Sequence, residues 1–424
     1  MKSVNKILAG AGVLVCAVSL TIGSTPLPAM AMIAHDKVVS ANPADNTPQI
    51  VLGTSGETTL AFAQIGSTMY AGGRFLQVQN PARTITYPRQ NFFSFNASTG
   101  EVSTLNLAFD GIVQTLVPGP DGKSLYIGGS FRKVNGVATQ AIVKYDLVND
   151  QLDPTFNAPT ANGTVSNAKL VNGRLIVVGT LAKYLLALDP TTGADTGYLN
   201  FSITGASNPG DITKVRRFST DPAGTMLVAL GNFTAINGQA RKQAFKVALG
   251  ATATLTTWHV PRFDGMCTKN LNIAQAIDFS PDGSYFVIGT TGASSGINEL
   301  CDAAARFEAN SVSPTAEPTW INWTGGDSIY GIGITGAAVY VGGHPRWLDN
   351  PYGNNTKGPG AVDRVGIGAI DPVSGKANSW NPGKTRGHGV EAFYATPTGL
   401  WIGSDGQFFA GENHAGIAFC PKPK

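Results

Sequence analysis

A short apolar segment that ends in glycine recurs seven times along the chain, and this repeat constrains the fold more than any other feature. The repeated glycines are Gly72, Gly128, Gly179, Gly231, Gly289, Gly342 and Gly403, so successive copies are 51 to 61 residues apart. The residues before each glycine are mostly aliphatic or aromatic, as in Leu125-Tyr126-Ile127. Repeats of about 50 residues built from such strands are typical of β-propellers. The sequence therefore predicts an all-β fold, a seven-bladed β-propeller over residues 32–424.

Each repeat contains several strand-like segments, and the second repeat shows them most clearly. Its first two segments are separated by Pro120-Asp121-Gly122, a tight-turn signal, and its third segment, 141–146, follows a longer polar loop. Throughout the chain the first turn is short and the loop before the third segment is long. Because successive connections in a blade alternate between two faces, the long loops are expected on one face. Binding residues are expected on that face, since rigid strands hold its loops.

The seventh repeat has only three strand-like segments, at 390–395, 400–403 and 415–420. A sheet edge without its partner strand would expose unpaired backbone groups. The apolar segment Gln49–Leu52 precedes the first repeat and has no other assignment. We therefore predict that Gln49–Leu52 is the outermost strand of the seventh blade and that it closes the ring.

Several segments of the repeats resemble those of known propellers. IGGSFRKVNG at 127–136 and LGNFTAINGQAR at 230–241 resemble delta-sixty-type propeller repeats. Residues 340–347, with 358–362 and 380–383, are similar to secreted actinobacterial propeller proteins. The resemblance covers nearly all of residues 32–424. It implies the architecture and a cell-envelope context, but no chemistry, because no activity is established for that family.

The N-terminus has the pattern of a targeting segment. Lys2 and Lys6 precede an apolar stretch at 7–22, and Ala29-Met30-Ala31 matches the small-residue cleavage signal. This pattern predicts a secretory signal peptide over residues 1–31 and a mature chain that is secreted, extracellular or associated with the cell envelope. A retained membrane anchor and a lipid attached to Cys16 remain as alternatives. No transmembrane span is expected in the mature chain.

The charge composition argues against nucleic acid as a partner. The chain has 30 Lys and Arg against 27 Asp and Glu, and no basic cluster of the kind that displaces counterions from phosphates. Residues 331–336 match the Gly-x-Gly-x-x-Gly pattern of dinucleotide sites, but they run into a strand rather than a helix. We expect the chain to bind no cofactor and no metal. We also expect it to be monomeric.

Three cysteines follow the targeting segment. Cys267 lies in the crossing into the fifth repeat, and Cys301 lies in the long loop of that repeat, so topology places both on one face. An exported chain meets an oxidising compartment. We therefore predict a Cys267–Cys301 disulfide and a buried free thiol at Cys420.

The long loops of the sixth and seventh repeats, together with the crossing between these repeats, hold the strongest concentration of polar functional groups. Imidazoles and carboxylates there could perform acid–base chemistry or hold a ligand, and arginine beside tryptophan suits a carboxylate or a sugar ring. The same side chains could instead only cap the long loops. The candidate ligand-binding residues are His344, Arg346, Trp347, Asp349, Arg386, His388, Asp405, Glu412 and His414.

The function favoured by these observations is a binding or scaffold module for a glycan or protein ligand of the cell envelope. One alternative is a glycan-active hydrolase or lyase that uses the polar loops of the sixth and seventh repeats. Another alternative is a purely structural assembly protein, which an exposed apolar patch would favour.

Overall fold

The all-β prediction is confirmed in the computed structural model, which describes residue 1 and residues 32–208, 210–265, 267, 273–293 and 297–424. The described residues contain one short 3-10 helix, η1 (Pro261–Phe263), and otherwise only strands, turns and loops. This helix, the one that the described residues contain, is not long and apolar enough to cross a membrane. The predicted signal peptide over residues 1–31 lies almost wholly outside the described residues.

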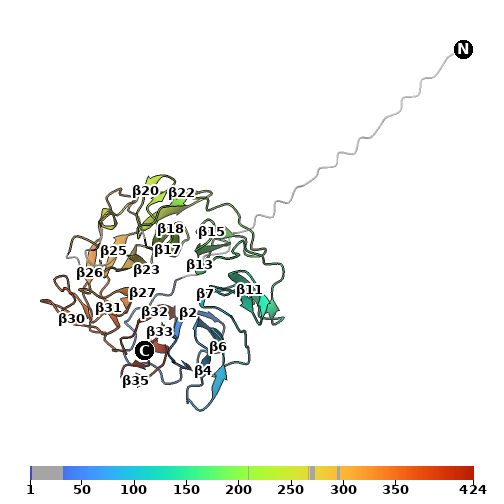
Figure 1. The fold of residues 1–424 in the computed structure, drawn as a ribbon, viewed down its shortest axis with the longest axis horizontal. Coiled ribbons are helices and arrows are strands. Elements are labelled where there is room, and N and C mark those ends of the chain that lie inside the picture. The colour runs from blue at the N-terminus through green and yellow to red at the C-terminus, as the bar shows by residue number, and fades with distance from the viewer. Residues whose placement is uncertain (2–31, 209, 266, 268–272, 294–296) are drawn as a thin grey trace.

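The seven principal antiparallel sheets of the described residues, numbered 1 to 7 in chain order, are arranged around a common axis (Figure 1). The first and innermost strands are β2 (Thr58–Ile65), β7 (Val113–Pro118), β13 (Val165–Val171), β17 (Lys214–Thr220), β23 (Ile273–Phe279), β27 (Ile329–Ile334) and β32 (Val390–Thr396). The second strands are β3 (Thr68–Arg74), β8 (Ser124–Gly129), β14 (Arg174–Gly179), β18 (Met226–Asn232), β24 (Tyr285–Thr291), β28 (Val339–Gly343) and β33 (Gly399–Ser404). Each first strand contacts the first strand of the next sheet, and β32 contacts β2.

The outer strands are shorter and less regular. The third strands are β6 (Phe92–Asn96), β11 (Ile142–Asp146), β15 (Leu185–Leu188), β21 (Ala244–Leu249), β25 (Ala303–Glu308), β31 (Ile367–Ile370) and β36 (Ile417–Pro421). Sheets 2, 4 and 5 add a fourth strand, which is β12 (Gln151–Leu152), β22 (Ala253–Leu255) or β26 (Trp320–Trp323). In sheets 1, 3 and 6 the third strand is paired there by a single isolated β-bridge instead of a fourth strand.

The long loops lie between the second and third strands, and short strands stiffen several of them. These are β4 (Gln77–Gln79) and β5 (Thr86–Pro88), β9 (Lys133–Val134) and β10 (Val137–Ala138), β19 (Ala235–Ile236) and β20 (Gln239–Ala240), β29 (Trp347–Leu348) and β30 (Val362–Asp363), and β34 (Phe408–Phe409) and β35 (Glu412–Asn413). A further short strand, β16 (Ile203–Thr204), pairs with β19. We call the side that carries these loops the loop face, and the side that carries the turns between first and second strands the turn face.

The repeated glycine has a packing role that explains its recurrence. A Cβ atom at Gly72 would lie 2.4 Å from Cγ1 of Val113, the first residue of the next sheet. At Gly342 it would lie 2.5 Å from Cβ of Val390. The core also lies between sheets, as where Phe92 of sheet 1 clusters with Leu125 of sheet 2. At these positions glycine permits the close approach of neighbouring sheets that buries this core, whereas at Gly179 and Gly231 it permits close approach to the backbone of the paired first strand.

The innermost strands share a second feature, an irregularity near the end that lies at the loop face. Pairing with the second strand shifts register there in all seven, as between Thr59 and Ala61 in β2. One residue stands at each shift, as in a β-bulge. The seven residues are Leu60, Gln114, Ser166, Arg216, Gln275, Tyr330 and Glu391. All of them line the space at the centre of the ring.

The N-terminal segment does run along sheet 7, but the predicted strand is the wrong one. Ser40 donates its backbone N–H to the carbonyl of Pro421, and Ala44 donates to that of Phe419, at 2.8 Å each. In contrast, β1 (Gln49–Ile50) pairs with β4 of sheet 1. It meets sheet 7 at Ala415, whose carbonyl accepts the Ile50 N–H at 3.0 Å, and through the side chain of Ile50, which packs with Trp401 and Ile417. An edge position needs only a few backbone donors, so a proline-containing segment without strand-like patterning can occupy it.

The disulfide prediction is confirmed. Cys267 and Cys301 are bonded, with a Cα–Cα distance of 5.9 Å, and they join the crossing before β23 to the loop between β24 and β25. Cys420 in β36 is a buried free thiol.

Candidate functional site

The polar loops of sheets 6 and 7 meet around one buried carboxylate that the sequence analysis did not single out. Asp327, whose side chain is 2% exposed, accepts hydrogen bonds from Nε and Nη2 of Arg346 at 2.8 and 3.0 Å. Nη2 of Arg386 reaches the same carboxylate at 2.6 Å. Nε of Arg386 also donates to the carbonyl of His344, at 2.9 Å. Both guanidinium groups are therefore occupied in joining loops, as the loop-capping alternative requires.

The two predicted histidines of this cluster both contact Tyr330. The rings of Tyr330 and His388 stack with their centroids 4.5 Å apart, and the ring of His344 meets Tyr330 edge-on at 5.2 Å. Nε2 of His344 accepts the backbone N–H of Ser328, at 3.3 Å. Burial lowers the pKa of His344, which favours the neutral imidazole that this acceptor role needs.

Asp405 joins this cluster through backbone groups rather than through an imidazole. Its carboxylate accepts the backbone N–H groups of His388 and Gly389. Nε2 of His388 instead faces Glu391, at 3.6 Å. Asp405 and His388 therefore do not form the acid–base pair that a hydrolase or lyase would use.

The remaining predicted residues serve separate local contacts. Nδ2 of Asn322 donates to the carboxylate of Asp349, and the N–H of Ala377 donates to it as well. Trp347 lies under the guanidinium of Arg346, with 4.3 Å between Cζ and the ring centroid.

Glu412 and His414 lie apart from this cluster, against the N-terminal segment. Nε2 of His414 faces Glu412 at 3.4 Å, and its Nδ1 hydrogen-bonds the hydroxyl of Thr47 at 3.0 Å. The nine predicted residues are thus divided among at least three local networks, and ligand binding by any of them stays a prediction.

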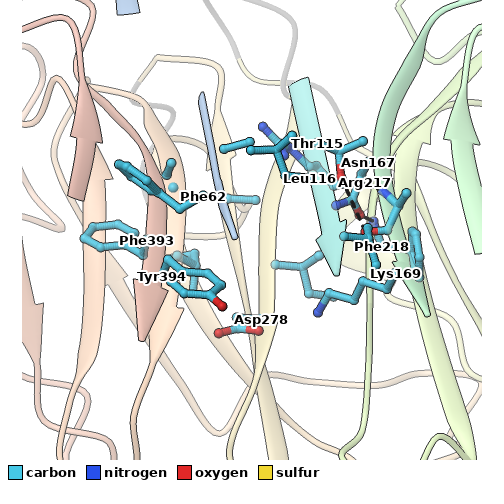
Figure 2. A pocket seen from close by; sticks show the side chains of 18 of the residues that line it. Phe62, Thr115, Leu116, Asn167, Lys169, Arg217, Phe218, Asp278, Phe393 and Tyr394 are labelled. Carbon is cyan, nitrogen blue, oxygen red and sulfur yellow. Dashed lines mark hydrogen bonds between the residues drawn. The ribbon is translucent and has the colours of Figure 1, made fainter. Parts of the chain in front are cut away.

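A second candidate site lies in the central channel, at the axis of the ring. The innermost strands enclose a cavity of about 390 Å³, and Figure 2 shows Lys169, Arg217, Asp278 and Tyr394 among its lining residues. An adjoining cavity of about 250 Å³ shares Leu60, Gln114, Arg217 and Glu391 with the first. Volumes of this order accommodate small ligands.

The channel ends differently at its two faces. The seven residues at the register shifts form its mouth at the loop face. Met32 and Ile33 line the other end, together with Asp221 and Pro222 of the turn between β17 and β18. His35 holds this segment in place, since its backbone N–H donates to the carbonyl of Thr335 at 2.7 Å. A ligand that enters from the loop face therefore ends against the N-terminal segment.

One set of charged groups in the channel fastens the sheets to one another. Nζ of Lys169 donates to the hydroxyl of Ser219 at 2.8 Å, and that hydroxyl lies 3.4 Å from Oδ1 of Asp278. Oδ2 of Asp278 accepts the N–H of Ile334, at 3.0 Å. Burial lowers the pKa of Lys169 and raises that of Asp278, while the attraction between the two charges opposes both shifts. This chain of contacts links four innermost strands, so its polar groups already have protein partners.

A second set of polar groups in the channel does not link the sheets in this way. Arg217 and Glu391 interact electrostatically, but no hydrogen bond or ion pair joins the guanidinium group of Arg217 to any residue that the structure describes. Glu391 has only the contact with His388 already given. The side-chain amides of Gln114 and Gln275 also lack a hydrogen bond within the described part of the chain. These four side chains, which we call the mouth residues, surround the loop-face opening.

The sequence analysis missed the mouth residues because it considered long loops rather than strands. A signal was present in the innermost strands themselves. Arg217 interrupts the strand KVRRFST, and Glu391 interrupts VEAFYAT. A charge in the middle of a strand that is otherwise buried indicates either a specific partner or a functional site.

Comparison with known proteins supports the propeller class without giving a function. Residues 119–156 match the family model described as a domain of unknown function (DUF5122) beta-propeller. The matched stretch runs from the turn before β8 through β12, which is most of sheet 2. No curated protein matches the chain. The findings therefore support a β-propeller family of unknown function, whereas the actinobacterial and delta-sixty-type likeness stays a prediction.

Proposed function

We propose that the chain is a secreted, seven-bladed β-propeller that acts as a binding module, and that it takes part of a glycan or protein ligand of the cell envelope into the channel mouth. The closed circle of contacts between successive innermost strands supports the seven-bladed architecture. The disulfide is compatible with an extracellular location.

The observation that carries this proposal is the set of four mouth residues. The side chains of Arg217, Gln114 and Gln275 make no hydrogen bond or ion pair in the described part of the chain, and Glu391 contacts only His388. Polar groups inside a protein normally find a partner, and ordered water or a ligand supplies it where the protein does not. The loops of sheets 6 and 7 support binding less well, because Asp327 already engages both of their arginines.

A blocking variant tests the location of the site. Gln114→Trp would fill the mouth from β7, and its side chain makes no hydrogen bond in the described structure that the change would remove. Lys123→Trp, at an exposed turn on the turn face, is the matched control. We expect the mature chain and the control to bind on glycan arrays or to purified envelope fragments, and Gln114→Trp to lose at least tenfold in affinity. Equal binding by all three proteins would place the site outside the channel.

A further inference from the structure

The two charged mouth residues have opposite signs and face one space. Arg217 extends from β17 in sheet 4, and Glu391 extends from β32 in sheet 7, so the charges approach from distant parts of the ring. Both residues line both cavities. They are near enough to attract each other but too far apart for a direct ion pair.

Two partly enclosed charges that do not contact each other lower the stability of the folded protein. Walls of protein partly remove each charge from water, and no contact with the opposite charge compensates. Sheets 3 to 6 show the arrangement that stability alone favours, since Lys169, Ser219 and Asp278 are joined in one chain there. Side chains that break this rule are expected at functional sites.

The chemistry of the mouth residues indicates which groups a ligand would need in order to pair with them. A guanidinium binds a carboxylate through two parallel hydrogen bonds, and a carboxylate binds an ammonium group. The amides of Gln114 and Gln275 offer both donors and acceptors for a peptide bond. The position of Met32 and Ile33 at the far end of the channel favours a ligand that presents a chain end rather than the middle of a polymer.

We propose, on the basis of the proposed function, that the channel mouth binds a short peptide with free ends, its carboxylate on Arg217 and its ammonium group on Glu391. A single amino acid satisfies the same pair of charges. A neutral glycan does not.

Three matched libraries of di- and tripeptides test this ligand class. One library has free ends, one is N-acetylated and one is C-amidated, and native mass spectrometry of the mature chain reads the bound fraction. We expect the free-ended library to bind, and each blocked library to bind at least tenfold more weakly. In Arg217→Gln the C-amidated library should bind as well as the free one. In Glu391→Gln the N-acetylated library should bind as well as the free one.

Melting temperatures separate this role from a structural one. Arg217→Gln should melt at or above the temperature of the unmodified protein, because it removes a partly enclosed charge that has no direct partner. Glu391→Gln should melt close to that temperature, because it loses only the contact with the exposed His388. Lys169→Met is the contrasting variant and should melt at a lower temperature, because it breaks the contact with Ser219.

Two results would overturn the proposal. Equal binding of blocked and free peptides, or no binding of any library, would reject recognition of the chain ends. If neutral oligosaccharides then bind and Gln114→Trp abolishes that binding, the proposed function stands with a different ligand. If nothing binds in the channel, both proposals fail.

Discussion

Arg386 and Asp327 are joined by a hydrogen bond of 2.6 Å that links the crossing into sheet 7 to the start of sheet 6. Arg346 binds the same carboxylate from the loop of sheet 6. Two loops of the loop face therefore depend on one buried negative charge.

Replacing that charge should destabilise the protein more than removing either arginine. In Asp327→Asn two guanidinium groups lose their counter-ion. Because both are partly exposed, we expect a cost of about 1–3 kcal/mol, below that of a fully buried pair. Arg386→Gln is the control and should cost less, because Arg386 is 44% exposed and Asp327 keeps Arg346. Urea unfolding at pH 7 measures both changes. Similar unfolding midpoints for Asp327→Asn and the unmodified protein would show that the network does not hold the loops.

Asp302 should make stability depend on pH in the opposite sense to most carboxylates. Burial, together with the charge of Asp327, raises its pKa to about 6, and its Oδ2 is buried without a hydrogen bond. Because the folded pKa lies above the ordinary 3.8, the ionised form is disfavoured in the native state. Its cost is small at pH 4, develops as the pH rises from about 4 to 6, and is complete at pH 7.

Asp302→Asn removes that cost while keeping the size of the side chain. Asparagine also tolerates the left-handed backbone at this position, where φ is 48°. We expect the variant to be more stable than the unmodified protein by about 1–3 kcal/mol at pH 7, from the shift of about two pKa units. At pH 4 the two proteins should unfold alike. A gain in stability that is the same at both pH values would exclude the carboxyl group as its cause.

The disulfide closes a loop with a sequence separation of 34 residues. The chain-entropy relation predicts that it stabilises the protein by about 3–4 kcal/mol. The double variant Cys267→Ser, Cys301→Ser should lose that amount in chemical denaturation. Cys420 supplies an internal control, because burial raises its pKa and it should resist alkylation until the protein unfolds. Rapid alkylation of Cys420 in the native double variant would show that the loss extends beyond the disulfide loop.

Truncation tests how the two ends of the described chain are joined. Removing residues up to Thr47 deletes the hydrogen bonds from Ser40 and Ala44 to β36 and the contact of Thr47 with His414. We expect a loss of several kcal/mol, since an edge of sheet 7 is then left unpaired. A shorter truncation, up to Asp36, keeps all of these bonds and should cost less. If both truncations melt at the same temperature, the contacts with β36 contribute nothing.

The repeat was readable from the sequence because one physical requirement recurs. Gly72 and Gly342 each face the first residue of the next sheet, so the same close approach selects glycine repeatedly. The pairing of Ser40 and Ala44 with β36 was not readable, because a segment beside Pro43 uses isolated backbone donors and shows no alternation of apolar residues.

The candidate site was only partly predictable for a related reason. Sequence places His344 and Arg346 in a long loop and Arg386 in a crossing on the same face, and the structure brings them together there. It cannot show that Asp327, a single acidic residue at the start of a repeat, already occupies both arginines. Conversely, Arg217 and Glu391 lie in strands of different repeats, and only the closed arrangement of the innermost strands brings them to one opening.

The bonds from Ser40 and Ala44 to Pro421 and Phe419 also set an order of events during synthesis. A chain that emerges with its N-terminus first produces residue 40 long before residue 421, so the first segment must wait without its partner. Local hairpins such as β2 with β3 can form early, because their strands are adjacent in sequence. The bonds from Ser40 and Ala44 therefore cannot form until β36 has been made. Until they form, the outer edge of sheet 7 is open to other chains, which favours aggregation of the incomplete protein.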